Sequence, residues 1–127
     1  LTNGYRVEVD GVAIAYISDH QQPADPTSVA PGVVELCRDA DLVIHDAQTA
    51  AEYALKADWG HCTIDYAVRV AEAAGARRLA LFHHDPSHTD DIVDRLVVEA
   101  RDAVSAGGPE VFAAAEGVTV SLASVLV

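Results

Sequence analysis

The sequence has no methionine, one lysine (Lys56), two cysteines and no apolar run of the roughly 20 residues that a membrane-spanning helix needs. Without methionine, Leu1 is not a translation start, and we expect the chain to be part of a longer protein. Cys37 and Cys62 cannot build a disulfide framework, which favours a reducing, cytoplasmic location. With 8 Lys and Arg against 20 Asp and Glu, the net charge is −12. This charge makes nucleic acid an unfavoured partner, because phosphate contacts need clustered basic side chains.

Half of the residues are apolar, which is enough for one buried core, and we expect a single domain over residues 1–127. Alternating apolar residues predict a β-hairpin over 5–16 with its turn at Asp10-Gly11. Further strands are predicted at 42–44, 79–82, 111–112 and 118–122. Helices are predicted at about 32–38 and 49–57, behind Thr63 up to Gly75, and from Thr89 to Gly107. This order predicts an α/β fold in which helices cover a sheet.

Polar side chains follow three of the predicted strands directly. Asp19 follows the hairpin, His45 and Asp46 follow the strand at 42–44, and His83 and His84 follow the strand at 79–82. The strand ends of such folds gather at one edge of the sheet, where sites are built. Imidazole and carboxylate groups without a set of thiolates suit zinc, manganese or iron. Taken singly, His45 is better explained as a core histidine, and His84 and His88 as solvated ones.

Four short motifs, taken together, favour the functional interpretation. They are Ser18-Asp19-His20, His45-Asp46-Ala47, His61-Cys62-Thr63 and the run from His83 to Pro86. In this order they resemble the second half of the metallo-β-lactamase-fold hydrolases. The resemblance is to the phosphodiesterase branch, which includes tRNA 3′-processing endonucleases and cyclic phosphodiesterases. It implies that the chain is the C-terminal half of a four-layer αβ/βα sandwich.

The resemblance also implies a role for each motif. Asp19 matches an aspartate that bridges two metal ions, and His83 matches a metal-binding histidine, with His84 as the alternative. His61 matches a catalytic histidine that serves the scissile phosphate and protonates the leaving oxygen. Asp46 stands where the family has a glutamate that orients this histidine. A carboxylate beside a histidine fixes its tautomer and favours its protonated form.

Cofactors and partners are implied in the same way. The resemblance implies two divalent ions, with zinc first and manganese or iron as alternatives, and a metal-activated water that cleaves a small phosphodiester or cyclic nucleotide. The family's His-x-His-x-Asp-His motif does not occur in this sequence. Asp19 and His83 are therefore too few ligands for two metal ions. We expect the site to be complete only when an N-terminal half is present. We expect that half, or a second copy, to cover an apolar sheet face.

Two alternatives come from other classes of protein. The segment from Asp41 to Asp46 resembles the central strand of a receiver domain, with Asp46 as the phosphoacceptor. A receiver also needs a lysine at the end of a later strand, whereas Lys56 is ten residues past Asp46. The second alternative is a non-catalytic metallo-β-lactamase-like binding module, in which Ser18, His20 and Asp46 are departures from the catalytic pattern.

Overall fold

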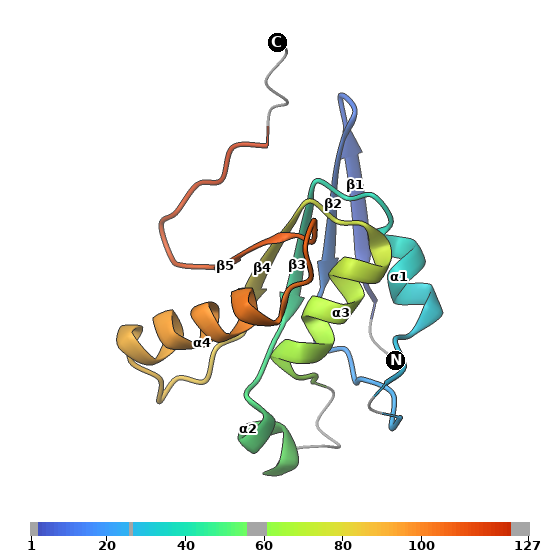
Figure 1. The fold of residues 1–127 in the computed structure, drawn as a ribbon. Helices are drawn as coiled ribbons and strands as arrows, with labels where there is room; N and C mark the ends of the chain where they lie inside the picture. Colours follow the sequence, from blue (N-terminus) through green and yellow to red (C-terminus); the bar gives the residue numbers. More distant parts are fainter. Residues whose placement is uncertain (1–2, 26, 56–60, 123–127) are drawn as a thin grey trace.

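A computed structural model describes residues 3–25, 27–55 and 61–122, which form one sheet of five strands and four helices (Figure 1). The strand order in the sheet is the order in the chain, with β1 and β2 antiparallel and every later pair parallel. The elements are β1 (Tyr5–Val9), β2 (Val12–Ile17), α1 (Pro31–Cys37), β3 (Leu42–Asp46), α2 (Ala50–Leu55), α3 (Ile64–Ala74), β4 (Arg78–Phe82), α4 (Asp90–Ala103) and β5 (Glu110–Ala113).

The predicted hairpin is confirmed. Asp10 and Gly11 have φ angles of 51° and 79°, the left-handed pair that a two-residue hairpin turn requires. The turn sets the register, so that Val9 lies opposite Val12 and Tyr5 opposite Tyr16. Local sequence is sufficient here, because the turn and the alternation are both short-range signals.

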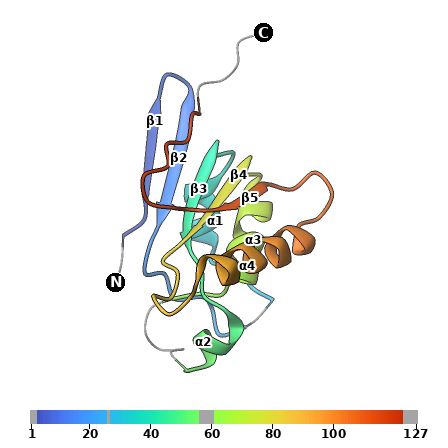
Figure 2. The ribbon, with the colours of Figure 1, turned by 90° about the vertical axis from the view of Figure 1, so that its left-hand side faces the viewer.

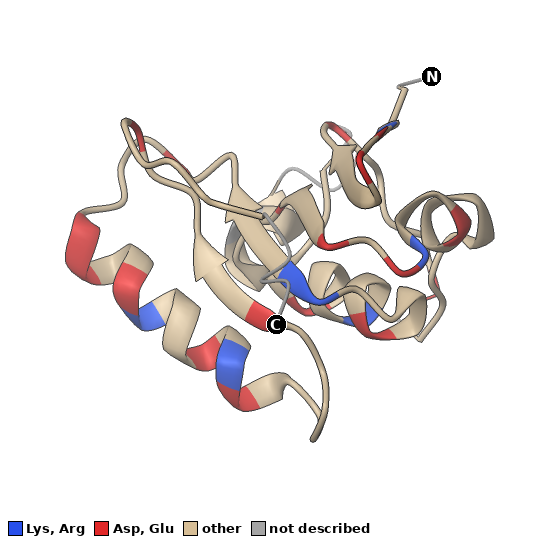
Figure 3. Ribbon diagram, turned by 90° about the horizontal axis from the view of Figure 1, so that it is seen from above, with Lys and Arg blue, Asp and Glu red and all other residues tan. Residues whose placement is uncertain are grey.

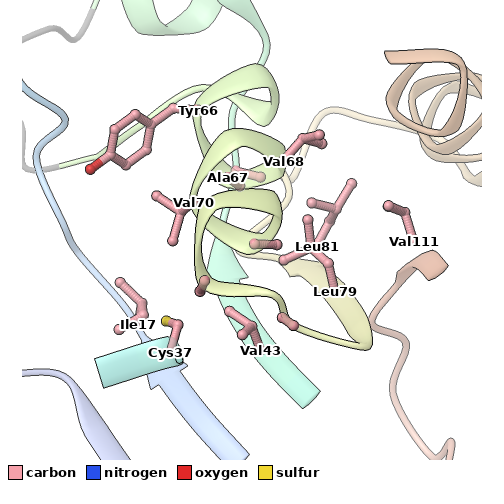
Figure 4. Close-up of a cluster of buried hydrophobic side chains, with 14 of the residues drawn as sticks. Ile17, Cys37, Val43, Tyr66, Ala67, Val68, Val70, Leu79, Leu81 and Val111 are labelled. Atoms are coloured by element: carbon pink, nitrogen blue, oxygen red, sulfur yellow. The ribbon is translucent and has the colours of Figure 1, made fainter. Parts of the chain in front are cut away.

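The helices α1, α3 and α4 lie on one face of the sheet (Figure 2). Each connects two neighbouring parallel strands, and crossovers of one hand along a sequential strand order place their helices on the same side. Apolar side chains from this face of the sheet pack against α3 (Figure 4). The fold therefore has two layers, one of strands and one of helices.

Both ends of α3 agree with the sequence prediction. The Thr63 side chain accepts a hydrogen bond from the Tyr66 amide, and Gly75 ends the helix with a φ of 70°. The predicted inward face included Ala67, Val68, Ala71 and Ala74, which are buried. It missed two fully buried residues on the flank toward α1, Tyr66 and Val70.

The face of the sheet opposite the helices carries exposed apolar side chains. The pairing of β1 with β2 places Tyr5, Val7 and Val9 on one face together with Tyr16. The exposed fractions of these four side chains are 58%, 53%, 61% and 38%. Their neighbours in β2 on the helix face, by contrast, are buried. The apolar open face that the sequence predicted is present, and we call Tyr5, Val7, Val9 and Tyr16 the open-face patch.

Some predictions need correction. Residues 118–122 form no strand, although they alternate well: the ladder stops at Ala113, and the chain then turns through Gly117 at a φ of 77°. Only Val97 and Ala100 of α4 are buried, since this helix lies at the edge of the core. The predicted end of α2 at 56–57 lies outside the described residues. No helix in the described ranges combines the length and apolarity needed to cross a bilayer.

Candidate metal and catalytic site

The carboxyl ends of β2, β3 and β4 meet at one edge of the sheet, because these strands are parallel neighbours. Asp19 follows β2, Asp46 ends β3 and His83 follows β4. One ligand atom from each of Asp19, His61 and His83 lies within 4.8 Å of the others. The structure thus brings together all four residues singled out in the sequence, since His61 is also bonded to Asp46.

His61 comes from the loop before α3, and main-chain bonds hold its position. Gln48 and Thr63 form an isolated parallel bridge that extends the β3 direction beyond the sheet. The Gln48 amide donates to the Cys62 carbonyl at 2.9 Å, and the Ile64 amide donates to the Gln48 carbonyl at 3.0 Å. The Gln22 side chain accepts from the Thr63 amide at 2.7 Å. The tripeptide His61-Cys62-Thr63 is therefore fixed on both sides.

His61 and Asp46 form a close pair. Nδ1 of His61 is 2.9 Å from Oδ2 of Asp46 and 3.9 Å from Oδ1 of Asp19. The His61 ring also stacks on that of His83, with 4.6 Å between ring centroids. Because an ionised carboxylate only accepts hydrogen bonds, Nδ1 of His61 carries a proton and Nε2 is left for another partner. The aspartate reaches the histidine although its side chain is shorter than the family's glutamate.

Asp46 is ionised although its side chain is only 1% exposed. Burial alone would raise the pKa of Asp46, but the nearby His45 imidazole and hydrogen bonds from Cys62 and His61 outweigh it and hold the pKa below its usual value. The negative charge therefore persists at neutral pH, and it lies directly beside Nδ1 of His61. The arrangement has the charge and proton position that a general acid needs.

Asp19 and His83 have unusual backbone conformations. Their φ angles are 52° and 62°, in the left-handed region that residues with a side chain rarely adopt. Both lie just past the end of a strand, Asp19 after β2 and His83 after β4. Strained residues of this kind concentrate at functional sites. At these positions each residue places a ligand atom close to one of His61.

The donor set fits a divalent metal ion. One carboxylate and two imidazoles lie close enough to share an ion, and these are ligands that zinc, manganese and iron accept. Asp19 and His83 each offer a ligand atom to this space, whereas His61 already donates through Nδ1 to Asp46. His84 does not belong to either group of possible ligands found among the described residues. The geometry therefore favours His83 over His84.

A second cluster, which was not predicted from the sequence, lies behind the site. His45, Asp46 and Cys62 are all fully buried, and their side-chain atoms also lie within 4.8 Å of one another. His20 is 2.9 Å from the Tyr66 hydroxyl, and that hydroxyl accepts from the Ala30 amide at 3.1 Å. All three residues of the second cluster belong to motifs recognised in the sequence, His45-Asp46-Ala47 and His61-Cys62-Thr63, but a contact between these motifs through Cys62 was not predicted.

Comparison with known proteins assigns the family. The family model for the beta-lactamase superfamily domain matches residues 1–84, well over half of the chain. The chain belongs to the beta-lactamase superfamily. Ribonuclease Z of Geobacillus kaustophilus is 42% identical over 76 residues, which are 59% of this chain and 25% of that protein. This chain thus spans about a quarter of the length of that relative.

Solved structures agree with this assignment. The metallo-beta-lactamase fold protein YhfI from Bacillus subtilis matches with a TM-score of 0.69 at 23% identity, over 91% of this chain and 42% of its own. The short form of human tRNase Z matches with a TM-score of 0.60 at 26% identity, over 94% of this chain and 36% of its own. The predicted metallo-β-lactamase fold is confirmed, and the receiver-like alternative is not favoured.

Proposed function

We propose that this chain carries part of the active site of a metal-dependent hydrolase that cleaves phosphodiester bonds. The observation that carries the proposal is the buried pair of Asp46 and His61 next to Asp19 and His83. Asp19 and His83 would hold divalent ions, which supply an acidified water and neutralise charge on phosphoryl oxygens. The residues matched to the family in the sequence keep these roles in the proposal.

His61 performs the proton transfer in this proposal. Its Nδ1 is bonded to Asp46, so Nε2 is the atom that faces the substrate. Nε2 donates its proton to the departing alkoxide, and the Asp46 carboxylate stabilises the positive ring before that transfer. Thr63 closes the motif as the N-cap of α3 and keeps the loop in place.

The substrate class within the phosphodiesters is inferred from two observations that disagree. The net charge of −12 favours a small phosphodiester, and acidic residues outnumber basic ones along α4 (Figure 3). The similar proteins named ribonuclease Z and tRNase Z favour RNA. The second observation has more weight, because this chain covers only part of those proteins and basic side chains elsewhere would not enter its charge. We therefore propose RNA ahead of a small diester.

A hydrolysis assay of the full-length protein that contains this chain tests the proposed function. With Zn²⁺ or Mn²⁺ added, we expect hydrolysis of bis(p-nitrophenyl) phosphate and, with higher kcat/KM, cleavage of a transfer RNA precursor with a 3′ extension. A chelator should remove both activities, and added metal should restore them. Hydrolysis of the small diester without cleavage of RNA would support the small-substrate alternative. Absence of both activities at any metal concentration would contradict the hydrolase proposal.

We also propose that a second sheet, from an N-terminal half or from a second copy, covers the open-face patch. The exposed side chains of Tyr5, Val7 and Val9 lie together on one flat surface, and such patches mark interaction sites. In sedimentation, the isolated 127-residue chain should associate to dimers or larger species. A Val7→Lys, Val9→Lys variant should be monomeric, because buried lysines disfavour the contact. A monomeric unmodified chain would contradict this proposal.

A further inference from the structure

The buried face of Asp46, away from the site, is held by a thiol. Sγ of Cys62 is 2.9 Å from Oδ1 of Asp46 and 3.1 Å from its main-chain oxygen. His61 occupies the other carboxylate oxygen, Oδ2, at 2.9 Å. The two oxygens of Asp46 therefore have different partners, which come from consecutive residues of one loop.

The direction of the bond between Cys62 and Asp46 follows from the chemistry of the two groups. Burial and the nearby Asp46 charge raise the pKa of the Cys62 thiol far above its ordinary value, so the thiol keeps its hydrogen. Cys62 is fully buried, and a carboxylate offers only acceptors. The thiol is accordingly the donor and Oδ1 the acceptor.

His45 does not replace this donor. Its Nδ1 is 2.8 Å from the main-chain oxygen of Asp46, which is an acceptor, and 3.6 Å from Oδ1. The proton on Nδ1 of His45 is thus directed to the main chain. Without the thiol, Oδ1 would be a buried charged oxygen with only a long contact to His45, which is costly enough to turn the carboxylate. Rotation of the carboxylate would also move Oδ2 away from His61.

We propose that Cys62 is a positioning residue, whose thiol donates to Oδ1 of Asp46 and thereby aims Oδ2 at Nδ1 of His61. This inference rests on the proposed function, in which His61 must present Nε2 to the substrate. Cys62 touches no reacting atom and acts through Asp46 alone. The middle position of the His61-Cys62-Thr63 motif then requires a small side chain with a donor hydrogen.

A pair of substitutions in the full-length protein tests the inference. Cys62→Ala and Cys62→Ser both shrink the side chain, but only serine keeps a donor. We expect Cys62→Ala to lower kcat about tenfold with KM nearly unchanged, as is typical when a supporting hydrogen bond behind a functional group is lost. Cys62→Ser should stay close to the unmodified protein. Equal losses in both variants would assign the effect to packing and overturn the inference.

A second measurement is independent of activity. In the metal-free protein, ¹⁵N NMR of the imidazole reports which nitrogen of neutral His61 carries the proton. We expect the Nδ1–H form in the unmodified protein and in Cys62→Ser, and a mixture of tautomers in Cys62→Ala. If Cys62→Ala does not fold, Cys62→Val supplies a donor-free side chain for the same comparison. An unchanged tautomer in the donor-free variant would overturn the inference even if the protein hydrolyses nothing, so the two failures are distinguishable.

Discussion

Replacing His61 by alanine is expected to lower kcat for a phosphodiester with an alkoxide leaving group by about 10²- to 10⁴-fold, the usual contribution of a positioned general acid. The physical reason is the short hydrogen bond from Nδ1 of His61 to the ionised, buried Asp46, which orients the ring and leaves Nε2 for the leaving group. The loss should be much smaller for bis(p-nitrophenyl) phosphate, because nitrophenolate leaves without a proton. Steady-state kinetics with both substrates measures the difference.

The control for this prediction is His88→Ala. His88 lies in the loop before α4 and is not a member of either cluster, so kcat should stay within about twofold of the unmodified value. Equal losses for both leaving groups in His61→Ala would contradict the general-acid role and indicate that His61 binds the metal or the phosphate instead. Retention of full activity with both substrates would remove His61 from the mechanism.

Replacing Asp19 by alanine is expected to reduce hydrolysis to the level of the metal-free protein. Asp19 offers a carboxylate oxygen to the same space as nitrogens of His61 and His83, so its removal would take away one of the few ligands that would hold the ions. Metal content measured by atomic emission after dialysis should fall together with activity. His83→Ala should give the same two losses, whereas His84→Ala should give neither.

Asp39 offers a matched control for the backbone cost of the Asp19 substitution. Its φ angle of 54° is nearly that of Asp19, at 52°, so alanine meets the same left-handed conformation at both positions. Asp39 lies after α1, away from the clustered ligands. Asp39→Ala should therefore keep metal content and activity. If it lost both, the effect of Asp19→Ala would reflect strain and not ligation.

The elements with local signals were predicted well. The Asp10-Gly11 turn, the Thr63 and Thr89 caps and the Gly75 helix end are each decided within a few residues, and the structure has all of them. The wrong predictions concern features that depend on contacts between distant parts of the chain. The alternating residues 118–122 form no strand. An alternating pattern becomes a strand only when it pairs with a neighbour, and within the described residues β5 is the last strand of the sheet.

By itself, the sequence determined which chemical groups are available and that they follow strand ends, because alternation and capping are short-range. It also contained the motif order that led to the metallo-β-lactamase fold. Only the tertiary structure decided which oxygen of Asp46 meets His61 and which meets Cys62, since these contacts join residues from separate elements. It likewise decided that His83, rather than His84, lies beside Asp19. The direction of a side chain depends on the backbone angles, and the left-handed φ of 62° at His83 was not predicted from the sequence.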